Sequence, residues 1–138
     1  MVASHEMFSV SLSFSRPTNL GVKDGRLAPC KRTPNCVSSQ ADPADAEHYI
    51  APLAFHGSMD ELRRAVESME RATVISAERN YLYAEFRTRL MRYVDDVELY
   101  YDEKQGVVHV RSASRLGRRD FGVNRNRIEA LRRIIGRT

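Results

Sequence analysis

Four segments between residues 72 and 114 alternate apolar and polar side chains, and this alternation limits the possible folds more than any other feature. The segments are 72–78, 81–89, 94–101 and 107–114, and only Arg79 and Asn80 separate the first two. Alternation on several neighbouring strands is typical of an antiparallel sheet with one covered face. A two-residue connection predicts a hairpin. We therefore expect four antiparallel strands whose apolar side chains point to one side.

Two amphipathic helices are predicted to cover that side. Ser58 and Glu61 form a capping-box pattern ahead of apolar residues that recur at helical spacing over roughly 59–71. A second helix follows "GVN", with Asn124 as its expected N-cap and Gly136 at its end.

The fold class follows from these elements. Segment 48–55 is a further short strand candidate, which Pro52 places at a sheet edge. We predict an α+β fold of two layers, with an antiparallel sheet of four to five strands and two helices packed on one face. The 138 residues fit one domain, divided into an N-terminal arm and loop (1–47) and the α+β domain (48–138).

Matching the apolar side chains across strands predicts a register. With Phe86 opposite Leu99 and Tyr101 opposite Val108, the other face carries a charged row that crosses three strands. The predicted pairs on that face are Arg87 with Glu98, Arg89 with Asp96, Glu98 with Arg111 and Tyr100 with His109, and Ile75 is placed on the apolar face. The row Arg87–Glu98–Arg111 would be an open polar platform that binds an anionic ligand. The alternative is an exposed face with weak ion pairs.

Basic residues are concentrated at the C-terminal end. Residues 111–137 hold nine arginines against Asp120 and Glu129, a local balance of +7, so the rest of the chain sums to −3. This asymmetry suggests an anionic partner, and a solvated helix rim is the alternative. Nucleic acid is disfavoured as a partner because the arginines surround the helix and no recognised nucleic-acid motif is present.

The sequence offers few residues for catalysis or metal binding. The four histidines lack metal-binding spacing, so we expect no metal and no cofactor. Cys30 and Cys36 would be a disulfide in an oxidising compartment and thiols in a reducing one. An enzyme that uses Cys36 with His109, or the Arg/Glu/His sheet face, is the alternative to a binding domain.

The expected location is cytoplasmic, or exported if a targeting segment is missing. No run of 18 apolar residues occurs, so no membrane span is predicted. The first fifteen residues lack the basic start of a secretory signal.

Several motifs together resemble a known family. The segments "PNCVSSQA", "AEFRTRLMRYVDDVELYYD" and "GVVHVRSASRLGRRDFGVNRNRIEALR" are similar to DUF1499, a domain of unknown function found in bacteria and in plastids. The resemblance covers about residues 25–134 and implies no established reaction; many members look exported or lipid-anchored. The loop with "PNCVSS" is expected to fold over one end of the sheet, where Arg115 and Asp120 would hydrogen-bond its backbone.

The predicted function is a non-enzymatic binding or accessory domain for a small anionic ligand or a protein partner. The oligomeric state is left open. The candidate binding residues are Asn35, Cys36, Ser38, Arg87, Glu98, His109, Arg111, Arg115 and Asp120.

Overall fold

The computed structural model describes residues 15–89 and 93–137. One antiparallel sheet, in the strand order β1-β6-β5-β4-β3, forms the first layer, and β2 also pairs with β6. The elements are β1 (Cys36–Ser38), β2 (Leu53–Ala54), α2 (Met59–Glu67), β3 (Ala72–Glu78), β4 (Tyr81–Arg87), β5 (Val94–Asp102), β6 (Val107–Ser114) and α3 (Val123–Ile135).

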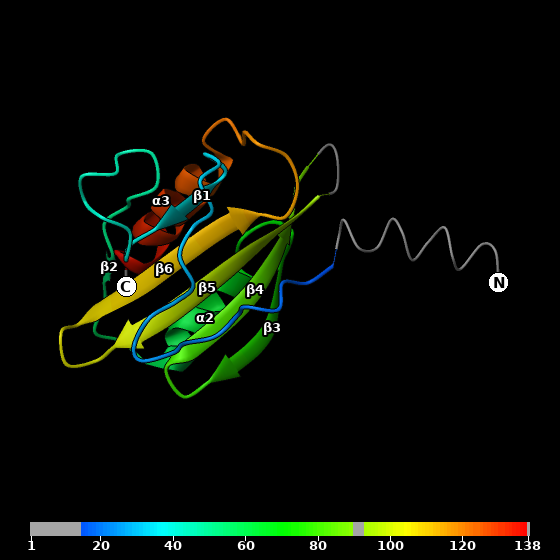
Figure 1. Cartoon of the computed structure of the whole chain (residues 1–138). Coiled ribbons are helices and arrows are strands. Elements are labelled where there is room, and N and C mark those ends of the chain that lie inside the picture. The colour runs from blue at the N-terminus through cyan, green and yellow to red at the C-terminus, as the bar shows by residue number, and fades with distance from the viewer. Residues whose placement is uncertain (1–14, 90–92, 138) are drawn as a thin grey trace.

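Both helices lie on one side of the sheet (Figure 1), which confirms the predicted two-layer α+β fold. Apolar side chains from the strands and helices meet between the layers, with Leu62, Leu99 and Ile128 fully buried. The sheet has six strands because β1 and β2 each add a short stretch to the outer edge of β6. Strand β1 comes from the segment that we predicted to be an arm.

The predicted register between β4 and β5 is wrong by four residues. Phe86 lies opposite Asp95, and Leu99 lies opposite Leu82. Apolar positions recur at every second residue, so registers that differ by an even number match the apolar side chains almost equally well. The even error left each side chain on its predicted face: Phe86 and Leu99 are both buried in the core.

The register error removes Arg87 from the predicted charged row. Arg87 pairs with Val94 at the end of β4 and is exposed, and Asp96 lies opposite Glu85 rather than Arg89. The prediction for β5 and β6 is confirmed, with Glu98 opposite Arg111. The row therefore holds two of its three predicted members.

An irregularity in β3 changes the predicted position of one apolar residue. The pairing with β4 shifts between Val74 and Ser76, as at a β-bulge. Ile75 is consequently 38% exposed instead of facing the core, and Ala72 and Val74 pack against the core in its place.

The helix boundaries also differ from the predicted ones. The capping box of Ser58 and Glu61 is confirmed, but α2 ends at Glu67. The N-cap of α3 is Gly122, not Asn124. The carboxylate of Asp120 accepts hydrogen bonds from the backbone N–H groups of Gly122 and Asn124, and so replaces the expected cap.

The polar face of the sheet is covered rather than open. Residues 15–31 run across it on the side opposite the helices (Figure 1). Contacts at three places hold this segment: Arg16 with Glu85, Gly21 with Glu98, and Pro29 with Arg111. Because of this cover, Glu98 and Arg111 are 0% and 6% exposed.

Candidate functional site

Glu98 and Arg111 form a buried ion pair beneath the covering segment. The nearest charged atoms, Glu98 Oε1 and Arg111 Nη1, are 3.8 Å apart. The other carboxylate oxygen of Glu98 accepts hydrogen bonds from the Tyr81 hydroxyl at 2.6 Å and from the Gly21 backbone N–H at 2.7 Å. Burial and the bond to Glu98 raise the pKa of Tyr81, so this hydroxyl remains a donor.

Arg111 is incompletely paired for a buried cation. Its Nη2 donates to the Pro29 carbonyl at 3.3 Å. Neither Arg111 Nε nor Glu98 Oε1 makes a hydrogen bond within the described residues, although both atoms are buried. Burial lowers the pKa of Arg111, and the attraction of Glu98 opposes this shift. A buried guanidinium N–H without an acceptor is costly and marks the position as a candidate ligand contact.

Arg115 lies beside this pair but is fully engaged. Its guanidinium donates to both carboxylate oxygens of Asp96, each at 2.9 Å, and to Glu85 at 2.6 Å. Burial alone would lower the pKa of Arg115, but the bonds to Asp96, Tyr83 and Glu85 outweigh it and raise the pKa. The prediction that Arg115 holds the backbone of the "PNCVSS" loop is therefore wrong.

Asn35 holds that loop to the end of the sheet instead. Its side-chain amide donates to the carbonyls of Leu116 and Gly117, and its own carbonyl accepts from Ser114 and Asn124. Asp120 likewise contacts the start of α3 and not the loop. The loop was expected to fold over one end of the sheet, but its residues 36–38 instead form β1, an edge strand that pairs with residues 111–113 of β6.

A pocket of about 410 Å³ opens between the covering segment, this loop and the sheet. Arg111 and Arg115 form part of its floor, and Lys31 adds an exposed ammonium group. We call it the Arg111 pocket. Its lining residues are Ser15, Pro17, Thr18, Asn19, Lys31, Asn35, Cys36, Asp96, Arg111, Ala113, Ser114 and Arg115.

A family model described as a protein of unknown function (DUF1499) matches residues 26–135. The chain belongs to the DUF1499 family. The match includes every sheet and loop residue of the Arg111 pocket, but not the pocket residues at 15–19. No curated protein and no solved structure matches the chain.

A second polar network of the DUF1499 domain lies on the helix side of the sheet, and the sequence did not predict it. Arg127 donates to Asp95 at 2.6 Å and stacks over the Phe86 ring. Asn124 is fully buried and bonds Ser112, Asp120 and Arg127, as well as the loop. The side chains of Arg127 and Asn124 are held by partners on the sheet, although the second carboxylate oxygen of Asp95 is buried without a hydrogen bond in the described residues, and the network fixes α3 on the sheet.

Two of the other six arginines in residues 111–137 also have structural partners. Arg125 donates to the Tyr49 carbonyl at 2.8 Å, and Arg132 donates to the carbonyls of Ala51 and Pro52 at 2.8 Å. These bonds fasten the segment before β2 to α3. Arg118 and Arg119 differ, since both are exposed in the connection from β6 to α3.

The predicted enzyme alternative needs a free Cys36 thiol beside His109. Cys36 is joined to Cys30 by a disulfide and is 2% exposed, so it offers no thiolate. His109 Nδ1 lies 3.1 Å from Ser39 Oγ, a contact that the sequence did not predict. Ser39 is buried and its hydroxyl already accepts the Val110 N–H, which ties the loop after β1 to β6.

Ser38 also has a structural role, because its backbone bonds the segment 48–50. Its N–H donates to the His48 carbonyl and its carbonyl accepts from Ile50. Among the predicted site residues, Asn35, Cys36, Arg111 and Arg115 line the Arg111 pocket, and Glu98 supports it from beneath. Arg87, His109, Ser38 and Asp120 lie outside its lining.

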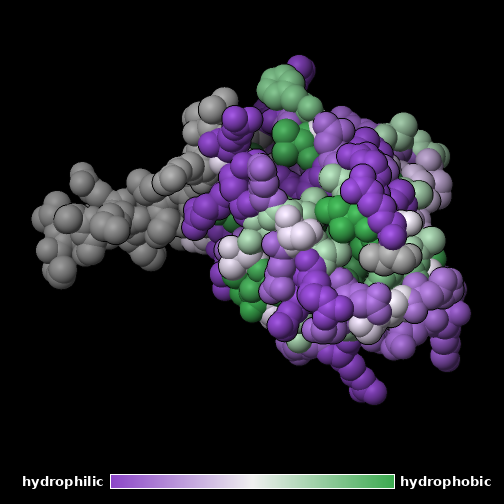
Figure 2. Space-filling view, turned by 180° about the vertical axis from the view of Figure 1, so that it is seen from behind, coloured by the Kyte–Doolittle hydropathy of each residue, from purple (hydrophilic) through white to green (hydrophobic). Residues whose placement is uncertain are grey.

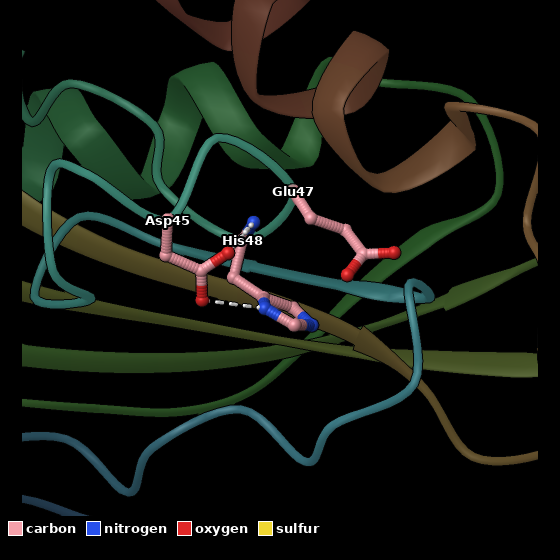
Figure 3. A group of neighbouring side chains, drawn as sticks. All are labelled: Asp45, Glu47 and His48. Atoms are coloured by element: carbon pink, nitrogen blue, oxygen red, sulfur yellow. Dashed lines mark hydrogen bonds and ion pairs between the residues drawn. The ribbon is translucent and has the colours of Figure 1, made fainter.

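One group in the described residues has metal-ligand chemistry, formed by Asp45, Glu47 and His48 (Figure 3). Both ring nitrogens of His48 are engaged, Nδ1 with Asp45 at 2.8 Å and Nε2 with the Thr33 carbonyl at 2.9 Å. A metal would have to displace one of these bonds. The His48 bonds to Asp45 and Thr33 give this group a structural role, in which it holds the loop 33–48 together.

Within the described residues, no helix has the length and apolar character that a membrane crossing requires.

Proposed function

We propose that this DUF1499 domain is a non-enzymatic binding module and that a small anion occupies the Arg111 pocket. One observation carries the proposal: a buried arginine lines a pocket and keeps a guanidinium N–H without an acceptor in the described residues. A phosphate or carboxylate group in the pocket would give the Arg111 side chain charge-assisted hydrogen bonds, which it lacks among the described residues. The pocket volume of about 410 Å³ lies in the range of small-molecule sites, so the anionic group can belong to a larger ligand.

The charges around the pocket support an anion over a cation. Lys31 makes no ion pair among the described residues. The one carboxylate in the lining, Asp96, is neutralised by Arg115 and also accepts from Tyr83. The carboxylate of Glu98 is turned to Tyr81 and Gly21 through one oxygen. The uncompensated charge at the pocket is therefore positive.

The test is a titration of the full chain, isotopically labelled, with inorganic phosphate and then with acetate. Amide signals of residues around the pocket, among them Asn35 and Ala113, should shift in a saturable way. Lys31→Glu should weaken phosphate binding by about tenfold, equivalent to about 1.4 kcal/mol. Lys104→Glu is the matched control, because Lys104 is also exposed but lies in the β5–β6 turn at the opposite end of the sheet.

Two arginine variants distinguish binding in the Arg111 pocket from non-specific attraction to basic residues. Arg111→Lys keeps the charge beside Glu98, and so the fold, but loses the guanidinium geometry; it should weaken binding. Arg87→Ala should leave binding unchanged, because Arg87 lies outside the pocket. The proposal fails if no pocket amide responds to either anion, or if the Lys31 and Lys104 variants weaken binding equally.

A further inference from the structure

The most exposed aromatic residue of the described chain is Phe121, in the connection from β6 to α3. Its side chain is 90% exposed, and its backbone φ of 53° lies in the left-handed region that a phenylalanine rarely adopts. Val123, two residues later, is 43% exposed. An apolar ring held in water by a strained backbone is unfavourable for the isolated domain.

The backbone on both sides of Phe121 is fixed. Asp120 bonds the N–H groups of Gly122 and Asn124, at 3.0 and 3.1 Å, and also the Asn124 side chain. At the start of the connection, Asn35 holds the carbonyls of Leu116 and Gly117. The ring is therefore presented from an anchored turn and does not hang from a loose loop.

The tip formed by residues 118–123 carries basic side chains, and further ones lie on the neighbouring disulfide loop. Arg118 and Arg119 are exposed in the same connection. Lys31 and Arg32 are exposed on the neighbouring disulfide loop, which Asn35 joins to it. The Asp120 carboxylate is used inside the turn, and Glu47 is an exposed acid in the hollow that Phe121 and Arg119 also line. Figure 2 shows hydrophobic atoms projecting at one end of the molecule, with hydrophilic side chains around them.

We propose that this tip docks on an anionic membrane surface, with the Phe121 ring in the interfacial layer and the arginines on the lipid headgroups. Charge complementarity favours an anionic surface. A fluid bilayer accepts a single projecting ring without a matching pocket, whereas a protein interface needs a broad complementary surface. This inference is independent of the Arg111 pocket and its ligand.

The expected binding is weak and depends on both ring and charge. Burial of one phenylalanine side chain contributes roughly ten- to a hundredfold to partitioning. Each basic residue near an anionic surface adds about fivefold, and added salt reduces this share.

Phe121→Trp gives a direct probe, because the chain contains no other tryptophan. The full chain with this substitution is mixed with vesicles of phosphatidylcholine and phosphatidylglycerol, or of phosphatidylcholine alone. The tryptophan emission should shift to the blue with the anionic vesicles and much less with the neutral ones.

Sedimentation with the same vesicles tests the contributions of ring and charge. Phe121→Gly should lower the affinity for the anionic vesicles at least tenfold. The fold should persist, because glycine readily adopts this positive φ. Arg118→Glu with Arg119→Glu should abolish the preference for anionic vesicles. The controls are Ile75→Ser, an exposed apolar residue on β3, and Arg79→Glu with Lys104→Glu at the opposite end of the sheet.

Membrane docking at the tip is overturned if vesicles leave the tryptophan emission unchanged, or if Phe121→Gly binds vesicles as the parent does. If the emission is unchanged, a protein partner is the alternative that would bind the tip. Binding lost equally in the tip variants and in the controls also overturns it.

Discussion

The backbone N–H of Gly21 donates to the carboxylate of Glu98 at 2.7 Å, across 77 positions of the sequence. This bond ties the covering segment to the centre of the sheet and buries the Glu98–Arg111 pair. A buried ion pair is held by its partners, because either charge alone is strongly unfavourable in the interior. The stability of the domain and the shape of the Arg111 pocket therefore depend on the same residue.

Glu98→Gln should consequently destabilise the domain by about 3–5 kcal/mol, since it leaves Arg111 buried without a counter-charge. Urea unfolding of both proteins measures the difference. Glu78→Gln, at an exposed position of β3, is the control and should change stability little. The double variant Glu98→Gln with Arg111→Gln should lose less than the two single variants together; simple additivity would contradict the coupling.

The sequence predicted the sheet face of a strand residue more reliably than it predicted which residue lies opposite on the neighbouring strand. Alternation sets the face, and an even register error preserves it, so Phe86 and Leu99 face the core as predicted. Glu98 and Arg111 were placed together correctly because the β5–β6 register was predicted correctly. The β4–β5 partner depends on the turn between the two strands, which the apolar pattern does not specify. Arg87 was therefore predicted to lie opposite Glu98, whereas it lies opposite Val94, four residues away along β5.

The cover over the polar face was not predictable from pattern. Two of the three contacts that hold residues 15–31 use the Gly21 N–H and the Pro29 carbonyl, backbone groups that every such segment has. Similarly, nothing near Asn124 in sequence shows that it bonds the carbonyl of Asn35, 89 positions away. The motif "PNCVSS" indicated an important loop, but its contacts required the three-dimensional structure.

Loss of the disulfide should weaken the domain moderately. Cys30 and Cys36 enclose a short loop with a sequence separation of 6. In the chain-entropy model such a cross-link contributes about 2 kcal/mol. Unfolding in urea with and without dithiothreitol tests this: the parent should lose stability on reduction, and the Cys30→Ser, Cys36→Ser double variant should be insensitive. Equal stability of the parent in both conditions would show that the cross-link contributes nothing.

Asp120→Ala should lower stability by about 1 kcal/mol or more, because Asp120 bonds two backbone N–H groups at the start of α3. Asp42→Ala is a suitable control, since Asp42 also accepts a local backbone bond but lies in an exposed turn away from a helix. Thermal unfolding compares the two. If the Asp120 variant is as stable as the parent, the assignment of Asp120 as the cap of α3 is wrong.

The contact of His48 with Asp45 should make stability depend on pH. Burial lowers the pKa of His48, but the bonds to the Thr33 carbonyl and the Asp45 carboxylate outweigh it, and the pKa is raised above 6.5. The contribution of protonated His48 is therefore complete below pH 6.5 and is lost as the pH rises through the folded pKa. The bond to His48 lowers the pKa of Asp45 below 3.8, so its contribution is lost only in stronger acid.

The variant His48→Gln isolates this effect. The parent should exceed it in stability most between about pH 4 and pH 6.5, and the difference should shrink at alkaline pH. Urea unfolding at a series of pH values measures the difference. His56→Gln is the control, because His56 is an exposed histidine outside this contact. A difference for His48→Gln that grows as the pH rises would mean that the ring is neutral in the folded protein, with the Thr33 carbonyl as the acceptor of its single N–H.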